Sequence, residues 1–190
     1  MKAIDPRMIY INLYLCEPMF CTNERTLMNQ YFLYVYSGHG SFRIGDTEYE
    51  AHCNDLFFCG KEVPNTITAA QKDPFILTGI DFDCDIDPKW YPPVINMTSN
   101  VGHEDLIREM IRSYNDPSGV SSQYCNALLK AFMLNITYFM QTDYCIPDET
   151  NRIMRYIKEN RGVDTGVGDL ERMQKSPSTS HNRRHRKERG

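Results

Sequence analysis

The stretch YFLYVYSGHGSFRIGDTEYEAHCNDLFFCGKEVPNTITA (residues 31–69) decides the expected fold. Its aromatic and β-branched residues come in short runs, and turn pairs such as Ser37-Gly38 and Gly45-Asp46 separate these runs about every eight residues. Short antiparallel strands joined by tight turns close into a small barrel or sandwich. The stretch therefore predicts a small antiparallel β-barrel within an α+β chain.

The strand pattern ends at WYPP (residues 90–93), because proline cannot donate to a sheet ladder. This places the barrel in residues 1–92. Apolar residues then recur at helical spacing over residues 103–115 and again over residues 121–141. Each helix must bury its apolar face against the other helix, the barrel or a second copy of the chain. We expect a helical region in residues 93–145, and its pattern fits a homodimer and an intramolecular core equally well.

Composition and charge narrow the class of protein. The chain of 190 residues has 41% hydrophobic and 24% charged residues, which is typical of globular proteins. Its net charge is -4, although residues 175–190 carry six Lys or Arg and one Glu. The remaining chain is acidic and repels phosphate, so any contact with DNA falls to the C-terminal tail. The chain lacks membrane-length apolar runs, a convincing signal peptide and CxxC pairs, which favours the cytoplasm and no membrane partner.

Sequence motifs for metal binding and catalysis are absent. A metal-binding barrel commonly has two His at alternate positions on one strand, and this sequence has no HxH pair. It also has no Gly-x-Ser-x-Gly elbow, HExxH motif, phosphate loop or dinucleotide fingerprint. The alternating acids of DFDCDID (residues 81–87) fit a Ca²⁺ or substrate site or, more simply, the solvated face of a strand. We expect no metal, no cofactor and no catalytic residue, and hence no enzyme.

Aromatic side chains of the barrel are the candidates for small-molecule binding, since the interior of a short-stranded barrel is a natural pocket. Successive strand residues point to opposite faces, so one of two alternating sets faces inward, and the pattern does not decide which. The candidate ligand-binding residues are Tyr34, Tyr36 and Phe58. They belong to a larger group of expected barrel residues: Tyr31, Leu33, Tyr34, Val35, Tyr36, Phe42, Phe57 and Phe58.

Residues 31–69 resemble the cupin-like sensing domain of AraC-type (AraC/XylS) transcription regulators. In that family a Gly-x-Gly hairpin, a Gly-Asp turn before Leu-Phe, and a Val-Pro-His stretch follow one another. Here YVYSGHGSFRIG, HCNDLFF and KEVPNTI stand in that order, with Asn54 at the usual Gly and Asn65 at the usual His. The resemblance implies a jelly-roll barrel that senses a small effector, such as a sugar, without metal. Ser37 replaces the arginine of the arabinose-binding member, so the ligand does not carry over.

The resemblance extends to the helices and the C-terminus. The two expected helices match the pair by which these regulators dimerise. RIMRYIKENRG (residues 152–162) resembles the first helix of the family's DNA-binding domain, and DLERM (residues 169–173) resembles the first helix of its helix-turn-helix. Residues 146–190 are therefore expected to form a partial helix-turn-helix domain with a basic tail. Its candidate DNA-binding residues are Ser178, Arg183, Arg184 and Arg186.

The tail departs from the family after SPS (residues 176–178). Polar and basic residues replace the apolar residues that seat a recognition helix, and a helix without apolar anchors is marginal in water. A truncation or a frameshift would explain this. The leading hypothesis is a ligand-responsive transcription regulator with impaired sequence-specific DNA binding. The alternatives are a cupin-like small-molecule enzyme or isomerase, and a dimerisation-only modulator of a full-length regulator.

Overall fold

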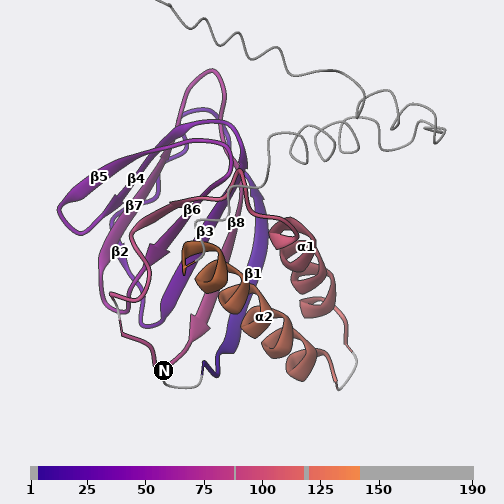
Figure 1. Cartoon of the computed structure of the whole chain (residues 1–190). Coiled ribbons are helices and arrows are strands. Elements are labelled where there is room, and N and C mark those ends of the chain that lie inside the picture. Colours follow the sequence, from indigo (N-terminus) through magenta and orange to yellow (C-terminus); the bar gives the residue numbers. More distant parts are fainter. Residues whose placement is uncertain (1–3, 88, 118–119, 142–190) are drawn as a thin grey trace, which may run out of the picture. The chain divides into compact units, whose positions relative to one another are not determined.

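The computed structural model describes residues 4–87, 89–117 and 120–141 (Figure 1). The chain divides into two compact units, Met1–Tyr144 and Cys145–Gly190, and all described residues belong to the first. The expected partial helix-turn-helix in residues 146–190, with Ser178, Arg183, Arg184 and Arg186, lies outside the described residues. It stays a prediction.

The first unit contains two antiparallel sheets, ordered β1-β8-β3-β6-β9 and β2-β7-β4-β5. Within the described residues the strands are β1 (Arg7–Leu15), β2 (Arg25–Thr26), β3 (Gln30–Ser37), β4 (Gly40–Ile44), β5 (Thr47–Ala51), β6 (Asp55–Cys59), β7 (Pro64–Ala69), β8 (Ile76–Asp83) and β9 (Val94–Asn96). The antiparallel pairs β1–β8, β2–β7, β3–β6 and β4–β5 are nested like one long hairpin that is folded over into two sheets. This is the jelly-roll arrangement, so the predicted antiparallel barrel is confirmed.

The expected end of the barrel at residue 92 is wrong by one short strand. β9 follows the two prolines and pairs with β6 at the edge of the five-stranded sheet. A proline has no N–H to donate, but its carbonyl still accepts. The Phe58 N–H donates to the Pro93 carbonyl at 3.0 Å, so the prolines accompany the sheet instead of ending it.

The two predicted helices are present as α1 (His103–Tyr114) and α2 (Ser121–Gln141). α1 begins after Gly102, which has a positive φ of 85°, and its first turn carries Glu104 and Asp105, where negative charge suits the helix dipole. Both helices lie along the five-stranded sheet (Figure 1). No helix among the described residues combines the length and apolar character needed to cross a membrane.

The central strands β8, β3 and β6 of the five-stranded sheet are buried on both faces. On β3 the side chains of Tyr31, Leu33 and Val35 join the core between the two sheets, whereas Phe32 and Tyr34 join the core beneath the helices. The inter-sheet core also contains Phe42, Ala51, Phe57, Cys59, Ile67, Ala69, Phe75 and Leu77. The helix-facing core includes Leu56, Phe58, Ile80, Phe82, Ile107, Met110, Leu129, Phe132, Met133 and Ile136. One sheet therefore separates two apolar cores.

The Gly-x-Gly hairpin between β3 and β4 has a steric basis. Gly38 has a φ of 83°, and a Cβ there would lie 2.3 Å from the Pro74 carbonyl oxygen. A Cβ on Gly40 would lie 2.1 Å from the Thr68 carbonyl oxygen. Backbone atoms cannot move aside as a flexible side chain can, so both positions require glycine.

We predict that Gly38→Ala lowers the free energy of unfolding by about 3 kcal/mol or more, because it combines an unfavourable φ with a backbone clash. Gly102→Ala is the matched control, since Gly102 has the same sign of φ but nothing within 4 Å of its added Cβ. The control should lose only about 1–2 kcal/mol. Urea unfolding measures both, and equal losses would contradict the steric explanation.

Candidate functional site

The structure places the three predicted ligand-binding residues on the outer face of the five-stranded sheet. Tyr34 and Phe58 are buried in the helix-facing core, and Tyr36 packs against it. Phe58 lies opposite Phe32 in the β3–β6 register, so the two rings point the same way. The alternating set that points into the barrel is therefore the other one, which includes Tyr31, Leu33 and Phe57. Their role in ligand binding stays a prediction.

Tyr34 instead connects the barrel to the start of α1. Its hydroxyl oxygen lies 3.0 Å from Asn54 Oδ1, 3.1 Å from Glu104 Oε1 and 3.0 Å from His103 Nε2. Burial raises the pKa of Tyr34 far above its ordinary value, and the nearby Glu104 raises it further. The hydroxyl is therefore neutral, and its hydrogen bonds link β3 to the turn before β6 and to α1.

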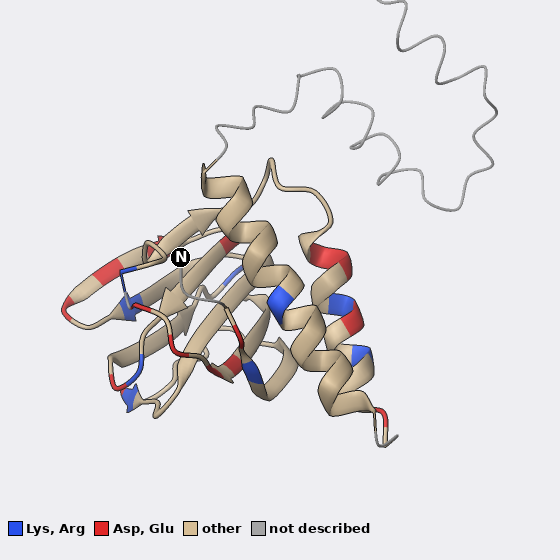
Figure 2. Cartoon of the chain, turned by 60° about the horizontal axis from the view of Figure 1, so that its bottom comes forward, with Lys and Arg blue, Asp and Glu red and all other residues tan. Residues whose placement is uncertain are grey.

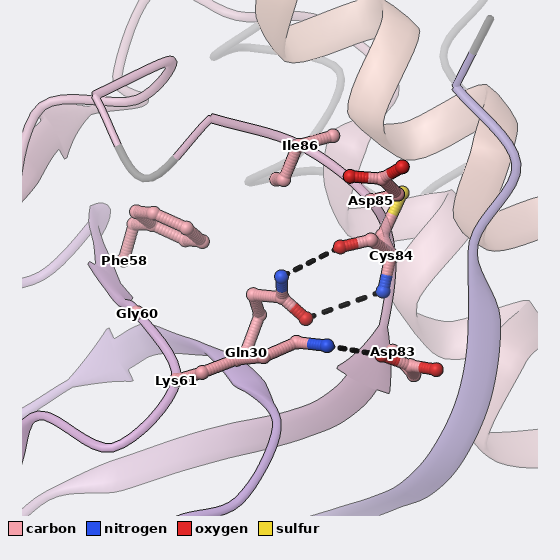
Figure 3. Close-up of a pocket in the computed structure, with 8 residues that line it drawn as sticks. All are labelled: Gln30, Phe58, Gly60, Lys61, Asp83, Cys84, Asp85 and Ile86. Atoms are coloured by element: carbon pink, nitrogen blue, oxygen red, sulfur yellow. Dashed lines mark hydrogen bonds and ion pairs between the residues drawn. The ribbon is translucent and has the colours of Figure 1, made fainter.

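A pocket of about 420 Å³ opens where β3 begins and where β6 and β8 end (Figure 3). Its volume lies within the range of small-molecule sites. Phe58 is the predicted ligand-binding residue that lines it. The complete lining is Gln30, Phe58, Gly60, Lys61, Asp83, Cys84, Asp85 and Ile86.

Several polar groups of this pocket are engaged with one another. Gln30 Nε2 donates to the Cys84 carbonyl at 2.6 Å, and the Cys84 N–H donates to Gln30 Oε1 at 3.2 Å (Figure 3). Lys61 forms an ion pair with Asp83, and the Lys61 hydrogen bond lowers the Asp83 pKa. Burial raises the pKa of the Cys84 thiol, which disfavours the nucleophilic thiolate. The Gln30 amide and the Lys61 ammonium are therefore both engaged within the lining of the pocket.

A second cavity of about 70 Å³ opens between the two sheets, beside their edge strands β1 and β2. We call it the barrel-mouth cavity. Its lining is Tyr14, Cys16, Phe20, Thr22, Arg25, Tyr31, Ile67 and Leu77. Tyr31, Ile67 and Leu77 belong to the inter-sheet core, so this cavity reaches the barrel interior that the sequence led us to expect as a pocket.

Arg25 is the charged residue of the barrel-mouth cavity, and sequence reasoning missed it. Its Nε donates to Asn65 Oδ1 at 3.0 Å, and its guanidinium carbon lies 5.2 Å from the centroid of the Tyr31 ring. The Nη2 atom is buried and has no hydrogen-bond partner. One indirect signal for this site was present in the sequence. Asn65, which accepts the hydrogen bond from Arg25, stands where the resembled family has histidine.

The residues of the barrel mouth do not fit a metal ion. Within the described ranges, no group of three or more His, Cys, Asp or Glu is placed to hold one. The groups that converge at the mouth are a guanidinium from Arg25, an amide from Asn65 and a phenol from Tyr31. A guanidinium repels a cation and has no lone pair to offer it. The alternating acids of DFDCDID likewise form no such group, and Phe82, Cys84 and Ile86 are buried between them, as a two-sided strand predicts.

In the comparisons with known proteins, this chain matches only solved structures. No protein-family model matches the sequence, and no curated protein matches it. KdgF from a Halomonas species is 9% identical, with a TM-score of 0.35 over 43% of this chain and 80% of that one. A cupin superfamily protein from Desulfitobacterium hafniense is 11% identical, with a TM-score of 0.36 over 43% and 79%. A salicylate 1,2-dioxygenase from Pseudaminobacter salicylatoxidans is 13% identical, with a TM-score of 0.35 over 43% and 26%.

These likenesses are too weak to carry an inference about activity. The jelly-roll assignment rests instead on the nested strand pairs of this chain. None of the three structures is named as a transcription regulator, so the resemblance to AraC-type regulators and the helix-turn-helix stay predictions.

Asp81 provides a test of the electrostatics near the barrel mouth. It lies opposite Tyr31 in the β3–β8 register, and its Oδ1 is buried without a partner. Burial raises the Asp81 pKa above its ordinary value of 3.8, so ionisation disfavours the folded state.

We predict that Asp81→Asn raises the stability of the folded protein more at pH 7 than at pH 3. The folded wild type loses stability as the pH rises from below 3.8 through the raised pKa of Asp81, whereas Asn does not ionise. Asp46→Asn, which makes the same substitution at an exposed turn position, is the matched control. Thermal unfolding at both pH values measures the difference, and a gain that is independent of pH would count against this assignment.

Proposed function

We propose that this chain is the sensing and dimerisation part of a ligand-responsive transcription regulator, cytoplasmic in location. The observation that carries the proposal is an exposed apolar stripe on α2. It consists of Tyr124, Ala127, Ala131, Leu134 and Tyr138, and we call it the α2 stripe. Such a face on a helix that is already packed on a barrel favours association with a second chain.

The α2 stripe has the spacing of a coiled-coil seam. Its residues alternate in steps of three and four, the heptad pattern that lets two helices pack along their length. The side chains of Tyr124, Leu134 and Tyr138 are 47%, 43% and 61% exposed. The opposite side of α2 buries Leu129, Phe132, Met133 and Ile136 against the barrel. α2 therefore has two apolar faces, and Figure 2 shows almost no charge on it, in contrast to α1.

A second copy of the chain fits the α2 stripe because the stripe complements itself. Large residues occupy its two ends, and the small Ala127 and Ala131 lie towards its middle. In an antiparallel pair with the two-fold axis near Ala131, each Leu134 lies over an Ala127 and each Tyr124 lies near a Tyr138. Such an isologous contact closes the assembly at two copies. We therefore propose a homodimer.

The barrel supplies the sensing part of the proposal. Two of the cavities among the described residues are suited to a small effector, and burial disfavours the thiolate form of Cys84 in the pocket of Figure 3. The regulator role rests on the resemblance of residues 31–69 to AraC-type proteins. DNA contact, if made, falls to the basic tail with Ser178, Arg183, Arg184 and Arg186. A dimer without DNA binding would correspond to the modulator alternative.

We predict that the chain is a dimer by light scattering and that Leu134→Glu weakens the dimer by about tenfold or more, because a carboxylate would be buried without a partner. Leu15→Glu is the matched control, since Leu15 is 74% exposed at the end of β1 and lies outside the α2 stripe. It should leave the dimer intact. A monomeric wild type at high concentration, or a Leu134→Glu variant that dimerises normally, would refute the proposed interface.

We predict that the basic tail attracts DNA weakly and without sequence preference. Fluorescence anisotropy at physiological salt should give dissociation constants of about 10⁻⁶ M or weaker, which loosen steeply as salt is raised. Replacing Arg183, Arg184 and Arg186 together by Gln should reduce both the affinity and the salt slope. Tight footprinting of one DNA sequence by the chain at physiological salt would contradict the expected impairment.

A further inference from the structure

The barrel-mouth cavity contains a cation with unused hydrogen-bonding capacity. A guanidinium has five N–H donors in a planar fork. Arg25 uses Nε on Asn65, and no described residue accepts a hydrogen bond from its buried Nη2. A buried donor without an acceptor is costly, and the cost is larger for a charged group. An acceptor oxygen that enters the cavity would remove this cost.

Two buried residues contact the guanidinium of Arg25. Tyr31 and Asn65 are 6% and 1% exposed, and they contact the guanidinium from different sheets. Asn65 Nδ2 in turn donates to the Arg25 carbonyl at 3.2 Å. The absence of a side chain on Gly79 leaves room for the Tyr31 ring, because a Cβ there would lie 2.2 Å from the Tyr31 hydroxyl. Arg25 is thus held between a phenol ring and an amide.

The other walls of the cavity select the shape of the ligand. Phe20, Ile67 and Leu77 are apolar, and Thr22 adds a hydroxyl. A volume of about 70 Å³ holds only a few non-hydrogen atoms. A guanidinium binds a carboxylate or a phosphate through two parallel N–H···O bonds, and the carboxylate is the smaller group and the one that can carry a short hydrocarbon end.

We propose that the barrel-mouth cavity binds a short aliphatic monocarboxylate of about two to four carbon atoms. The carboxylate accepts hydrogen bonds from Arg25, and its hydrocarbon end lies among Phe20, Ile67 and Leu77. The inference deepens the proposed function, on which it rests, by naming the effector class as a small carboxylate, where the resemblance to AraC-type regulators implies a small effector such as a sugar.

The test uses the full chain and isothermal titration with acetate, propionate and butyrate, beside butyramide as the neutral match for butyrate. Saturable binding of a carboxylate, with the amide about tenfold weaker or more, is the expected result. Arg25→Gln should weaken carboxylate binding by about tenfold or more. Arg43→Gln is the matched control, because Arg43 is exposed, pairs with Glu24 and does not line the cavity, and it should bind like the wild type.

Arg25→Gln also removes the hydrogen bond from Arg25 Nε to Asn65. A second variant therefore distinguishes loss of binding from misfolding. Cys16→Phe keeps Arg25 but fills the cavity, and it should abolish carboxylate binding while circular dichroism shows a folded protein. Equal binding of butyrate and butyramide, unchanged binding in a folded Arg25→Gln or Cys16→Phe variant, or no saturable binding of any of the three carboxylates overturns the inference. Light scattering on the same samples separates the two proposals, since a dimer that binds no carboxylate overturns only this one.

Discussion

The packing of Phe32 is the contact on which the described structure depends most. Its ring is fully buried and stacks on Phe82 at 4.9 Å, with Phe58 and Tyr91 each at 5.4 Å and Phe132 at 5.7 Å. These rings come from three strands of one sheet, the segment before β9, and α2. Phe32 therefore makes the helix part of the same apolar core as the sheet, and aromatic pairs of this kind add to the stability that burial alone provides.

The position of Phe32 on β3 connects the two parts of the proposed function, effector sensing and dimerisation. Gln30 lines the larger pocket and Tyr31 lines the barrel-mouth cavity, so both cavities adjoin the residues just before Phe32. Through Phe132, the same strand holds the buried face of α2, which leaves the α2 stripe exposed. An effector in either cavity thus lies next to a residue one or two positions before Phe32, whose ring packs against Phe132 of the helix that we propose joins two copies.

The fold could be predicted from local pattern to a useful degree. Strand spacing in residues 31–69 and helical spacing in residues 103–115 and 121–141 gave the elements, since each depends on which faces of one segment are apolar. The continuous apolar run of β3 was a further signal, because strands buried on both faces read as unbroken apolar stretches. By that signal, Tyr34 and Phe58 could be assigned to a core beneath the helices as readily as to the barrel interior.

The candidate site was less predictable. Arg25 lies on a strand of two residues, too short to show alternation, and its partners Tyr31 and Asn65 are brought to it only by the pairing of β2 with β7 and the closure of the two sheets. Likewise, strand β9 follows two prolines, and no local rule reveals that the Pro93 carbonyl accepts a hydrogen bond from the sheet. These features depend on contacts between segments that are distant in sequence, and such contacts cannot be predicted from local sequence patterns alone.

Disulfide cross-linking along the α2 stripe tests the central claim of an antiparallel homodimer most directly. In a background in which Cys145 and, among the described residues, the exposed Cys21 and Cys53 are replaced by Ser, Ala131→Cys and Ala127→Cys are compared under mild oxidation. Ala131 lies near the proposed two-fold axis, whereas Ala127 lies opposite Leu134 of the other copy. We expect a cross-linked dimer for Ala131→Cys and little for Ala127→Cys. Cross-linking of neither variant, or equal cross-linking of both, would contradict the antiparallel pairing.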